Sequence, residues 1–306
     1  MKLKKKVIVT GGSGLFGINF FFINRKKFKL FLFSNKTRSS SKRIKLRSLD
    51  LTSKKKVLNK FKYINPDVIL HAAAITNMDF CQKNKLLSKK INENTTKFIT
   101  DYCKKNKKKL IFISSDNVFF NKIKFKKETH KTFSRNYYGL TKINSENYIK
   151  KKLNDFVILR TNFFGWGTKY RKSFSDHIID NTKNKIVSNL FTNVYFNPVY
   201  VGTLSKIIEI IIKKNISGIF NITSDNRISK YNFGKKIAKK FNLNTNYIKK
   251  NILTNKSRVL RPFEMTLDNK KIKKQLNIKN IQIYDEIKKL KSCKYKNIIQ
   301  KIDKLI

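Results

Sequence analysis

The sequence predicts an α/β fold in which a doubly wound parallel sheet is joined to a smaller α/β lobe. Three observations lead to this prediction: short apolar runs alternate with helix-like segments in the first half of the chain, a glycine-rich turn follows the first run, and polar or small residues follow several others. A chain of 306 residues is also long enough to bury such a core.

The glycine-rich turn is the feature around which the other elements are ordered. A short buried strand is expected at residues 7–9, where three β-branched residues precede the turn. Gly11, Gly14 and Gly17 follow at intervals of three. This spacing suits a tight turn, close approach of a pyrophosphate to the backbone, and close packing of a helix at about 15–24. The amides at the start of that helix would face a phosphate. A glycine-rich loop without a ligand is the alternative.

The cofactor preference depends on the end of the second predicted strand, at residues 30–33. An acidic residue near this position holds the adenosine ribose hydroxyl of NADH, whereas a basic one accommodates the extra phosphate of NADPH. Here the basic residues Lys36 and Arg38 follow the strand and no acid does. The sequence therefore favours NADPH, and NADH stays open because lysine is abundant throughout the chain.

The alternation of strands and helices continues to about residue 161. Further strands are expected at 44–49, 68–70 and 110–113, and amphipathic helices at 53–64 and 87–105. A sixth strand would be followed by Leu159-Arg160-Thr161. This order is typical of a Rossmann-like sheet whose strands are connected by helices.

Polar or small residues follow three successive predicted strands. Asp50 and Leu51 follow the third strand, His71-Ala72-Ala73-Ala74 the fourth, and Ser114-Ser115-Asp116 the fifth. Ligands of open parallel sheets bind at this carboxyl edge, so these residues are expected to line a site. The alanines either make room for a flat cofactor ring or close-pack the end of a strand.

Tyr138 and Lys142 form the strongest chemical signal. Four residues apart on a helix, they share one face and can meet. A tyrosine pKa near 10 is too high for efficient acid–base work at neutral pH, and a cation about 4 Å away would lower it by about three units at most. We therefore expect Lys142 to bring Tyr138 into the useful range. Ser115, at the end of the fifth strand, precedes the pair in the order expected of one site.

These motifs together resemble the extended short-chain dehydrogenase/reductases. The resemblance rests on the glycine turn, residues 71–74, Ile91-Asn92, residues 114–119 and the Tyr138/Lys142 pair. Within that group, residues 66–82 and 110–142 are most similar to the thymidine-diphosphate-4-dehydrorhamnose reductase family and its sugar-nucleotide relatives, and matching segments continue to Arg261-Pro262. The resemblance implies NADPH-dependent reduction of the 4-keto group of a nucleotide-activated 6-deoxysugar.

The resemblance also implies roles for individual residues. Tyr138 would donate the proton, Lys142 would lower its pKa and bind the nicotinamide ribose, and Ser115 would hydrogen-bond the carbonyl, while Asn92 would belong to the surrounding network. The implied cofactor contacts are Gly11, Gly14, Leu15, Phe16, Gly17, Lys36, Arg38, Asp50, Leu51, Ala73, Ala74, Ile75, Tyr138 and Lys142. The implied substrate contacts are Ser115, Asp116, Asn162, Phe163 and Arg261, and no metal ligand is predicted.

Several departures from the family pattern fall on the sugar side of the expected site. Asn117 stands where tyrosine is common, and Phe163 stands where tryptophan is common, with Trp166 slightly beyond. The identity of the sugar therefore stays open. Trp166 either stacks on a base or sugar or packs at the rim. Arg261 either binds a diphosphate bidentately or forms a surface salt bridge.

The expected domain division has two interleaved parts. Residues 1–161 would form the dinucleotide-binding domain, with 194–225 returning to it, and residues 162–193 and 226–306 would form the substrate-binding lobe. In the second part, helices are expected around 204–211 and 231–241, with another helix capped by Asp268. The tail, 281–306, reads as one basic amphipathic helix.

Composition limits the partners and the compartment. The formal net charge of +53 suggests an anionic partner, yet no arginine cluster, zinc spacing or recognition helix accompanies it, so no specific nucleic acid is predicted. Three widely separated cysteines argue against a disulfide framework and for a reducing compartment. With no apolar stretch long enough to span a membrane, a cytoplasmic protein is expected, and a homodimer stays open.

Three classes of function remain at this point. The first is the NADPH-dependent reductase of a nucleotide-activated deoxysugar. The second is a nucleotide-sugar epimerase or dehydratase on the same fold. The third is a non-catalytic regulatory subunit, since the regulatory subunit of methionine adenosyltransferase resembles these reductases. Retention of Ser115, Tyr138 and Lys142 together favours an enzyme.

Overall fold

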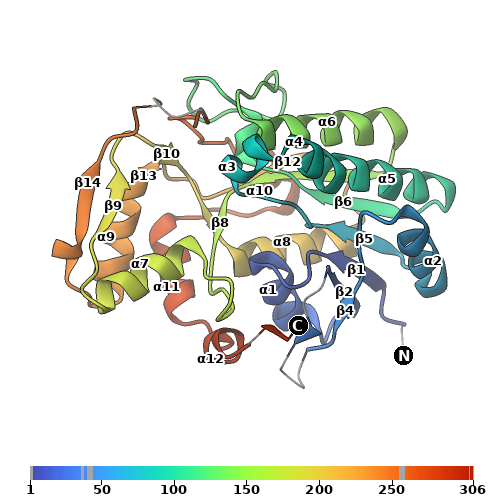
Figure 1. The fold of residues 1–306 in the computed structure, drawn as a ribbon, viewed down its shortest axis with the longest axis horizontal. Coiled ribbons are helices and arrows are strands. Elements are labelled where there is room, and N and C mark those ends of the chain that lie inside the picture. Colours follow the sequence, from blue (N-terminus) through green and yellow to red (C-terminus); the bar gives the residue numbers. More distant parts are fainter. Residues whose placement is uncertain (1–2, 36–37, 40–43, 255–258, 303, 306) are drawn as a thin grey trace.

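The computed structural model describes residues 3–35, 38–39, 44–254, 259–302 and 304–305. Its centre is a seven-stranded sheet with the order β12-β7-β6-β5-β1-β2-β4, in which every neighbouring pair is parallel (Figure 1). The strands are β1 (Lys6–Thr10), β2 (Lys29–Ser34), β4 (Leu46–Ser48), β5 (Val68–His71), β6 (Lys109–Ile113), β7 (Phe156–Thr161) and β12 (Gly218–Ile222). The predicted Rossmann-like sheet is confirmed.

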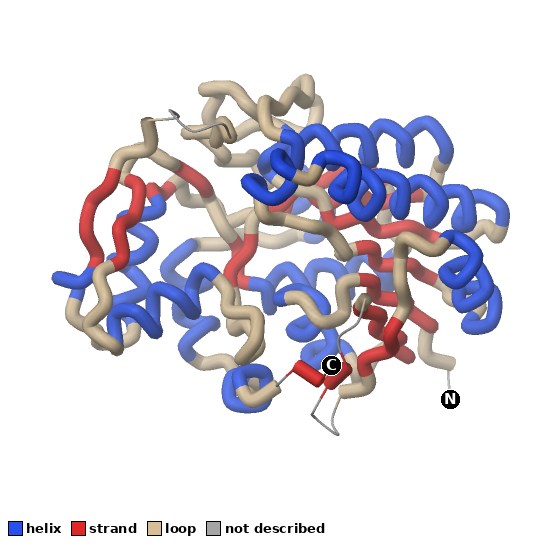
Figure 2. The backbone as a smooth tube through the Cα atoms, in the orientation of Figure 1, coloured by secondary structure: helices blue, strands red, loops and turns tan. Residues whose placement is uncertain are grey.

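Helices cover both faces of this sheet (Figure 2). One face packs against α1 (Leu15–Asn24) and α8 (Val201–Lys214), and the opposite face against α2 (Lys54–Ile64), α5 (Thr95–Lys105) and α6 (Tyr137–Lys152). Each face of the sheet has its own hydrophobic core, and alternate residues of β1 pack into one or the other. Val7 and Val9 lie in the core with α1 and α8, and Ile8 lies in the core on the opposite face. Burial on both faces explains why these strands are continuous apolar runs in the sequence.

Outside the central sheet and its covering helices lie several short elements, which we call the second lobe (Figure 1). Strands β9 (Ser188–Phe191) and β14 (Ile248–Asn251) pair in parallel, and β10 (Tyr195–Phe196) pairs antiparallel with β13 (Ile228–Ser229). The strand β8 (Phe163–Phe164) pairs with β11 (Val199–Tyr200). The helices are α7 (Phe174–Lys183), α9 (Lys230–Lys240), α10 (Lys270–Leu276) and α11 (Ile283–Lys291), and a single turn of 3-10 helix, η3, spans Thr245–Tyr247.

The prediction of one regular helix at 87–105 is wrong in detail. It follows α3 (Met78–Lys83) and consists of α4 (Lys85–Ser88), a π-helical turn η1 (Lys89–Asn94) and then α5. A π turn inserts an extra residue into the helix, which changes the direction in which its side chains point. The amphipathic spacing in the sequence does not reveal this insertion.

The tail prediction is also wrong, because residues 281–306 do not form one helix. The chain leaves α11 at Ser292, forms α12 (Lys296–Gln300), and ends in β15 (Lys304–Leu305), which pairs with β3 (Arg38–Ser39). The break lets the Tyr295 ring stack on Phe22 of α1, with centroids 5.5 Å apart. Helix α10 has Asn269 at its N-cap position, and the capping hydrogen bond comes as predicted from Asp268, whose carboxylate accepts from the amide of Lys270 at 2.7 Å.

Within the described residues, none of the helices has the length and apolar character needed to cross a bilayer. Clusters of three or more metal-ligating side chains are likewise not found in this part of the chain.

A buried chain of hydrogen bonds joins β1 and β5 to α5. The Thr10 hydroxyl contacts Nδ1 of His71 at 2.7 Å, and Nε2 of His71 contacts the Thr96 hydroxyl at 3.0 Å. Thr10 also accepts hydrogen bonds from the amides of Ala72 and Ala73. Burial, with a smaller contribution from the charge of Lys142, lowers the pKa of His71 to about 3, so the imidazole is neutral in the fold.

This neutral histidine makes the fold sensitive to acid. The folded pKa lies below the unfolded value of 6.5, so the unfolded chain binds the proton first and stability falls as the pH drops from 6.5 towards 3. Between pH 6.5 and 3, the free energy of unfolding should fall less in His71→Asn than in the wild type. The difference between the two losses should be about 4 kcal/mol at most. Urea unfolding at a series of pH values measures this.

His130→Asn is the matched control, because His130 lies in a loop and is only partly buried. It should keep the wild-type pH dependence. Parallel wild-type and His71→Asn curves would contradict the assignment of the acid sensitivity to His71.

Candidate active site

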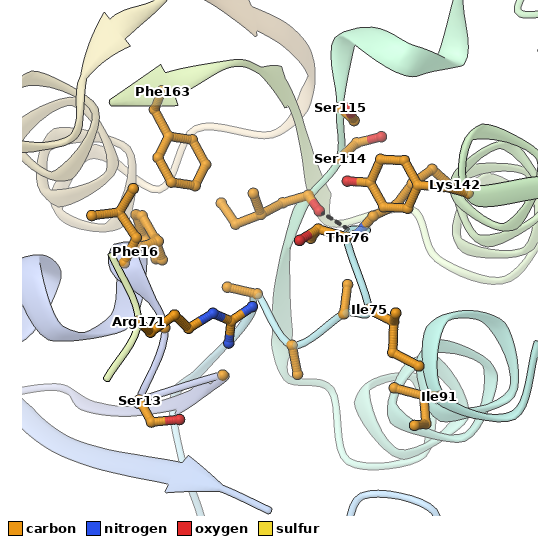
Figure 3. Close-up of a pocket in the computed structure, with 18 of the residues that line it drawn as sticks. Ser13, Phe16, Ile75, Thr76, Ile91, Ser114, Ser115, Lys142, Phe163 and Arg171 are labelled. Atoms are coloured by element: carbon orange, nitrogen blue, oxygen red, sulfur yellow. Dashed lines mark hydrogen bonds between the residues drawn. The ribbon is translucent and has the colours of Figure 1, made fainter. Parts of the chain in front are cut away.

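A pocket lies at the carboxyl edge of the sheet, where the chain turns away from β1 and β5 in opposite directions. Its volume is about 740 Å³, and it is lined by residues from both lobes. Figure 3 shows Ser13, Phe16 and Arg171 on one side, and Ile75, Ser115 and Lys142 on the other. A switch point of this kind is the usual ligand site of a doubly wound sheet.

The glycine turn closes one end of the pocket, and Gly11 and Gly14 line it. Gly11 has φ +71°, and a Cβ there would lie 2.9 Å from the amide nitrogen of Ala73, so a side chain is excluded on both counts. Gly14 is the N-cap of α1, and the first turn of that helix carries no acidic residue. Gly17 does not line the pocket; it lies against Gly11 and Gly12 and sets the close packing of α1 on the turn.

Most of the predicted cofactor contacts come together in this pocket. Gly11, Gly14, Leu15, Phe16, Asp50, Leu51, Ala73, Ala74, Ile75, Tyr138 and Lys142 all line it. Asp50 accepts hydrogen bonds from the backbone amide and the hydroxyl of Thr52, which lower the pKa of its carboxyl. Lys36 lies outside the described residues, and of Arg38 the structure describes only the backbone, in β3. The basis for choosing NADPH over NADH therefore remains the sequence.

Tyr138 stands in the first turn of α6, at the middle of the pocket. The side chain of Asn136 caps this helix by accepting a hydrogen bond from the amide of Gly139. A Cβ on Gly139 would lie 2.4 Å from the carbonyl oxygen of Asn117, so a glycine is needed for α6 to approach the loop after β6. This approach brings the Tyr138 hydroxyl within hydrogen-bonding range of Ser115.

The prediction that Lys142 lowers the pKa of Tyr138 is not supported by the structure. Burial raises the pKa of Tyr138, and the hydrogen bond with Ser115 offsets only part of this effect. The Lys142 ammonium instead donates to the carbonyl oxygen of Ile113 at 2.9 Å and lies 4.5 Å from the centroid of the Phe112 ring. Burial lowers the pKa of Lys142 itself to about 8. Burial is therefore the largest influence on the pKa of each group.

Asn92 connects the cofactor side of the pocket to α6. Its side-chain oxygen accepts from the amide of Ile75, and its side-chain nitrogen donates to the Ile75 carbonyl and to the Thr141 hydroxyl. Asn92 lies in the π-helical turn η1. The irregular turn thus supplies the residue that ties the loop after β5 to the helix carrying Tyr138 and Lys142.

A buried ion pair anchors α6 to the ends of two strands. Glu146 receives three hydrogen bonds from the Arg160 guanidinium, the shortest at 2.7 Å, and one from the Ser114 hydroxyl. Both charged side chains are almost completely buried. Arg160 is the last residue but one of β7 and Ser114 follows β6, so the pair fixes the helix against the carboxyl edge.

Replacing Glu146 by glutamine should destabilise the protein strongly. The substitution leaves the Arg160 charge buried without a counter-charge, which costs about 3 kcal/mol or more. Asp180→Asn breaks the exposed Lys172–Asp180 pair and should cost about 1 kcal/mol or less. Equal losses in urea unfolding would show that the Glu146 pair is not the anchor of α6.

The substrate side of the pocket is polar and largely paired. Asp116 accepts hydrogen bonds from Asn162, Asn117 and the Ser115 hydroxyl, and burial raises the pKa of its carboxyl. The side-chain oxygen of Asn117 is buried without a hydrogen-bond partner among the described residues, and Asn117 lines the pocket. Phe163 completes this side, packed edge-on against Phe16.

Two residues singled out in the sequence lie elsewhere. Arg261 does not line the pocket; its guanidinium pairs with Asp79 at 2.5 Å and also contacts the sulfur of Met78. Trp166 is neither a stacking platform nor a rim residue, because it is 1% exposed and its indole donates to the carbonyl of Leu290. The indole packs in the core instead, edge-on to the Phe241 ring.

Several lining residues were not predicted. The largest is Arg171, and the others include Ser13, Thr52, Thr76, Ile91, Thr161, Lys172, Ser173 and Phe174. The sequence could have marked Arg171 as a candidate, since an arginine just after Gly165-Trp166-Gly167 is unusual in a chain so rich in lysine. Nothing in the local sequence, however, places that loop over the glycine turn.

The parallel sheet, the glycine turn and the convergence of Ser115, Tyr138 and Lys142 define an extended short-chain dehydrogenase/reductase. The family model described as RmlD substrate binding domain matches residues 5–292. The chain belongs to this family, and the resemblance predicted from the sequence is confirmed.

Individual relatives agree with the family. The probable low-salt glycan biosynthesis reductase Agl14 of Haloferax volcanii is 21% identical over 291 residues, covering 93% of this chain and 97% of that protein. The dTDP-4-dehydrorhamnose reductase of Aggregatibacter actinomycetemcomitans is 24% identical over 194 residues, covering 60% of this chain and 65% of that protein.

Solved structures share the fold. A dTDP-4-dehydrorhamnose reductase of Bacillus anthracis in complex with NADP superposes with a TM-score of 0.83 at 23% identity, covering 95% of this chain and 99% of that one. The UDP-glucose 4-epimerase of Thermus thermophilus in complex with NAD has a TM-score of 0.78 at 15% identity, covering 94% and 99%. At these identities the likeness bears on the fold and does not choose between reductase and epimerase.

Proposed function

We propose that the protein is an NADPH-dependent reductase of the 4-keto group of a nucleotide-activated 6-deoxysugar, working in the cytoplasm. The observation that carries the proposal is the convergence of Ser115, Tyr138 and Lys142 on a pocket that also contains the glycine turn. Membership of the RmlD family and the reductase names of two relatives support it.

The described residues fit a dinucleotide. The N-terminus of α1 has no side-chain cap and no acidic residue, so its amides and its dipole are available to a pyrophosphate. The alanines after β5 leave the pocket wall flat beside Ile75 and Ile91, where a ring can lie. When bound there, the nicotinamide supplies hydride to the C4 carbonyl carbon.

The chain's own residues handle the oxygen and the proton. Ser115 and Tyr138 present two hydroxyl groups on the same side of the pocket, both able to hydrogen-bond the carbonyl oxygen. Because burial raises the Tyr138 pKa, the phenol stays protonated at neutral pH, as a proton donor must. An alkoxide is far more basic than a phenolate, so the transfer is still downhill.

The polar wall beyond Tyr138 is suited to a sugar. The unpaired side-chain oxygen of Asn117 can accept a hydrogen bond from a sugar hydroxyl, and this would remove the cost of burying it alone. Asp116 and Asn162 hold each other in place next to it. We infer that these three residues, with Phe163, contact the sugar. We also infer that Arg261 binds the diphosphate of the substrate, which would take the place of Asp79 as the partner of the guanidinium.

The alternatives are less well supported by the same pocket. A dehydratase needs a further acid–base group near Tyr138, and of the described lining residues the carboxylates are Asp50 and Asp116. Asp116 is already engaged by three side chains. A purely regulatory subunit would not require Ser115, Tyr138 and Lys142 to meet, although it could keep the fold.

Tyr138→Phe tests the proposal directly. Removing the proton donor should lower kcat for NADPH oxidation with a 4-keto-6-deoxy nucleotide sugar by about a hundredfold to ten-thousandfold. NADPH affinity, followed by fluorescence titration, should change little because the ring remains.

Tyr137→Phe is the matched control, since it removes a hydroxyl from the neighbouring residue, which does not line the pocket. It should keep wild-type kcat. Turnover by Tyr138→Phe at the wild-type rate would contradict the assigned role, and a wild-type protein that binds NADPH but reduces no keto sugar would contradict the proposed function.

A further inference from the structure

A loop of the second lobe reaches across the pocket to the glycine turn. The loop, residues 165–173, leads from β8 into α7 and is held at both ends by Asp176, whose carboxylate accepts from the amides of Gly167 and Ser173 at 2.7 Å each. The Tyr170 hydroxyl donates to the carbonyl oxygen of Ser13 at 3.3 Å. The loop is therefore attached to the turn that begins α1.

Arg171 extends from this loop into the pocket, as Figure 3 shows. A Cβ built on Gly14, the N-cap of α1, would lie 3.9 Å from Nη1 of Arg171. The guanidinium is thus adjacent to the uncapped helix N-terminus. A side chain at position 14 would therefore reach the guanidinium, and glycine keeps this side of the turn open.

The side chain of Arg171 has no carboxylate partner in the described part of the chain. Three other cations of the second half have carboxylate partners: Arg160 pairs with Glu146, Arg227 with Glu264, and the adjacent Lys172 with Asp180. The Arg171 side chain is exposed at the pocket wall, and together with the positive end of α1 it offers an anion two positive components.

We propose that Arg171 is a cofactor-binding residue that contacts the pyrophosphate of the dinucleotide from the second lobe, opposite the N-terminus of α1. This inference rests on the proposed function for the identity of the ligand. It adds a contact from the loop between β8 and α7, so that cofactor binding draws together the two lobes that form the pocket.

The position of Arg171 favours the pyrophosphate over the additional phosphate of NADPH. That phosphate is expected beyond the end of β2, near Ser34 and Asn35, whereas the Arg171 guanidinium lies beside Gly14 at the start of α1. The two phosphates can be separated experimentally, because ADP-ribose carries only the pyrophosphate and adenosine 2′-monophosphate carries only the other.

The experiment is calorimetric titration of wild type, Arg171→Met and Arg171→Lys with NADPH, ADP-ribose and adenosine 2′-monophosphate at two salt concentrations. Losing a charge-assisted bidentate contact should weaken NADPH and ADP-ribose by about tenfold to a hundredfold. Arg171→Lys should bind more tightly than Arg171→Met because lysine keeps the positive charge. It should bind less tightly than the wild type because lysine lacks the paired N–H donors of the guanidinium. Adenosine 2′-monophosphate should bind all three proteins alike.

Lys183→Met, at the exposed end of α7, controls for the loss of one positive charge and should bind as the wild type does. Thermal unfolding checks that Arg171→Met is folded. Unchanged affinity of Arg171→Met for ADP-ribose would overturn the inference, as would a loss confined to NADPH and adenosine 2′-monophosphate.

The outcomes separate this inference from the proposed function. In one outcome, Arg171→Met binds ADP-ribose more weakly while the wild type turns over no keto sugar. That result would support the pyrophosphate contact of Arg171 and contradict the proposed reductase function. Wild-type protein that binds neither NADPH nor ADP-ribose would overturn both.

Discussion

The buried ion pair between Glu146 and Arg160 is the interaction on which the geometry of the site depends. Glu146 lies one helical turn after Lys142 and is held by residues at the ends of β6 and β7. The helix that carries Tyr138 and Lys142 is therefore fixed to the same edge of the sheet as Ser115. A buried pair of this kind is costly to assemble and costly to break, so it specifies position more than it adds stability.

Burial at this edge also determines the chemistry available to each side chain. Desolvation raises the pKa of Tyr138 and lowers those of Lys142 and His71, keeping the phenol protonated and the imidazole neutral. A network of neutral donors and fixed dipoles suits stabilisation of a developing negative charge on a carbonyl oxygen. The tyrosine works in this account as a retained proton source, and its acidity need not be matched to neutral pH.

The sequence predicted the features that depend on local pattern. Buried strands appear as apolar runs, the glycine spacing marks the turn, and Tyr138 and Lys142 share a helical face, so these elements and most lining residues were identified. It did not predict features that depend on tertiary contacts. The π turn at Asn92, the tail that breaks to stack Tyr295 on Phe22, and the loop that carries Arg171 to the glycine turn are each set by a distant partner. The same reason explains the error about Lys142, whose ammonium pairs with a carbonyl of a neighbouring strand.

Transfer of label from the cofactor tests the central claim most directly. The protein would be incubated with NADPH deuterated on the face of nicotinamide C4 that it uses and with a nucleotide-activated 4-keto-6-deoxysugar, and the sugar product would be examined by NMR. The account predicts one deuterium at C4 of the reduced sugar and an equal amount of oxidised cofactor. A sugar that is epimerised or dehydrated without net oxidation of NADPH would contradict it.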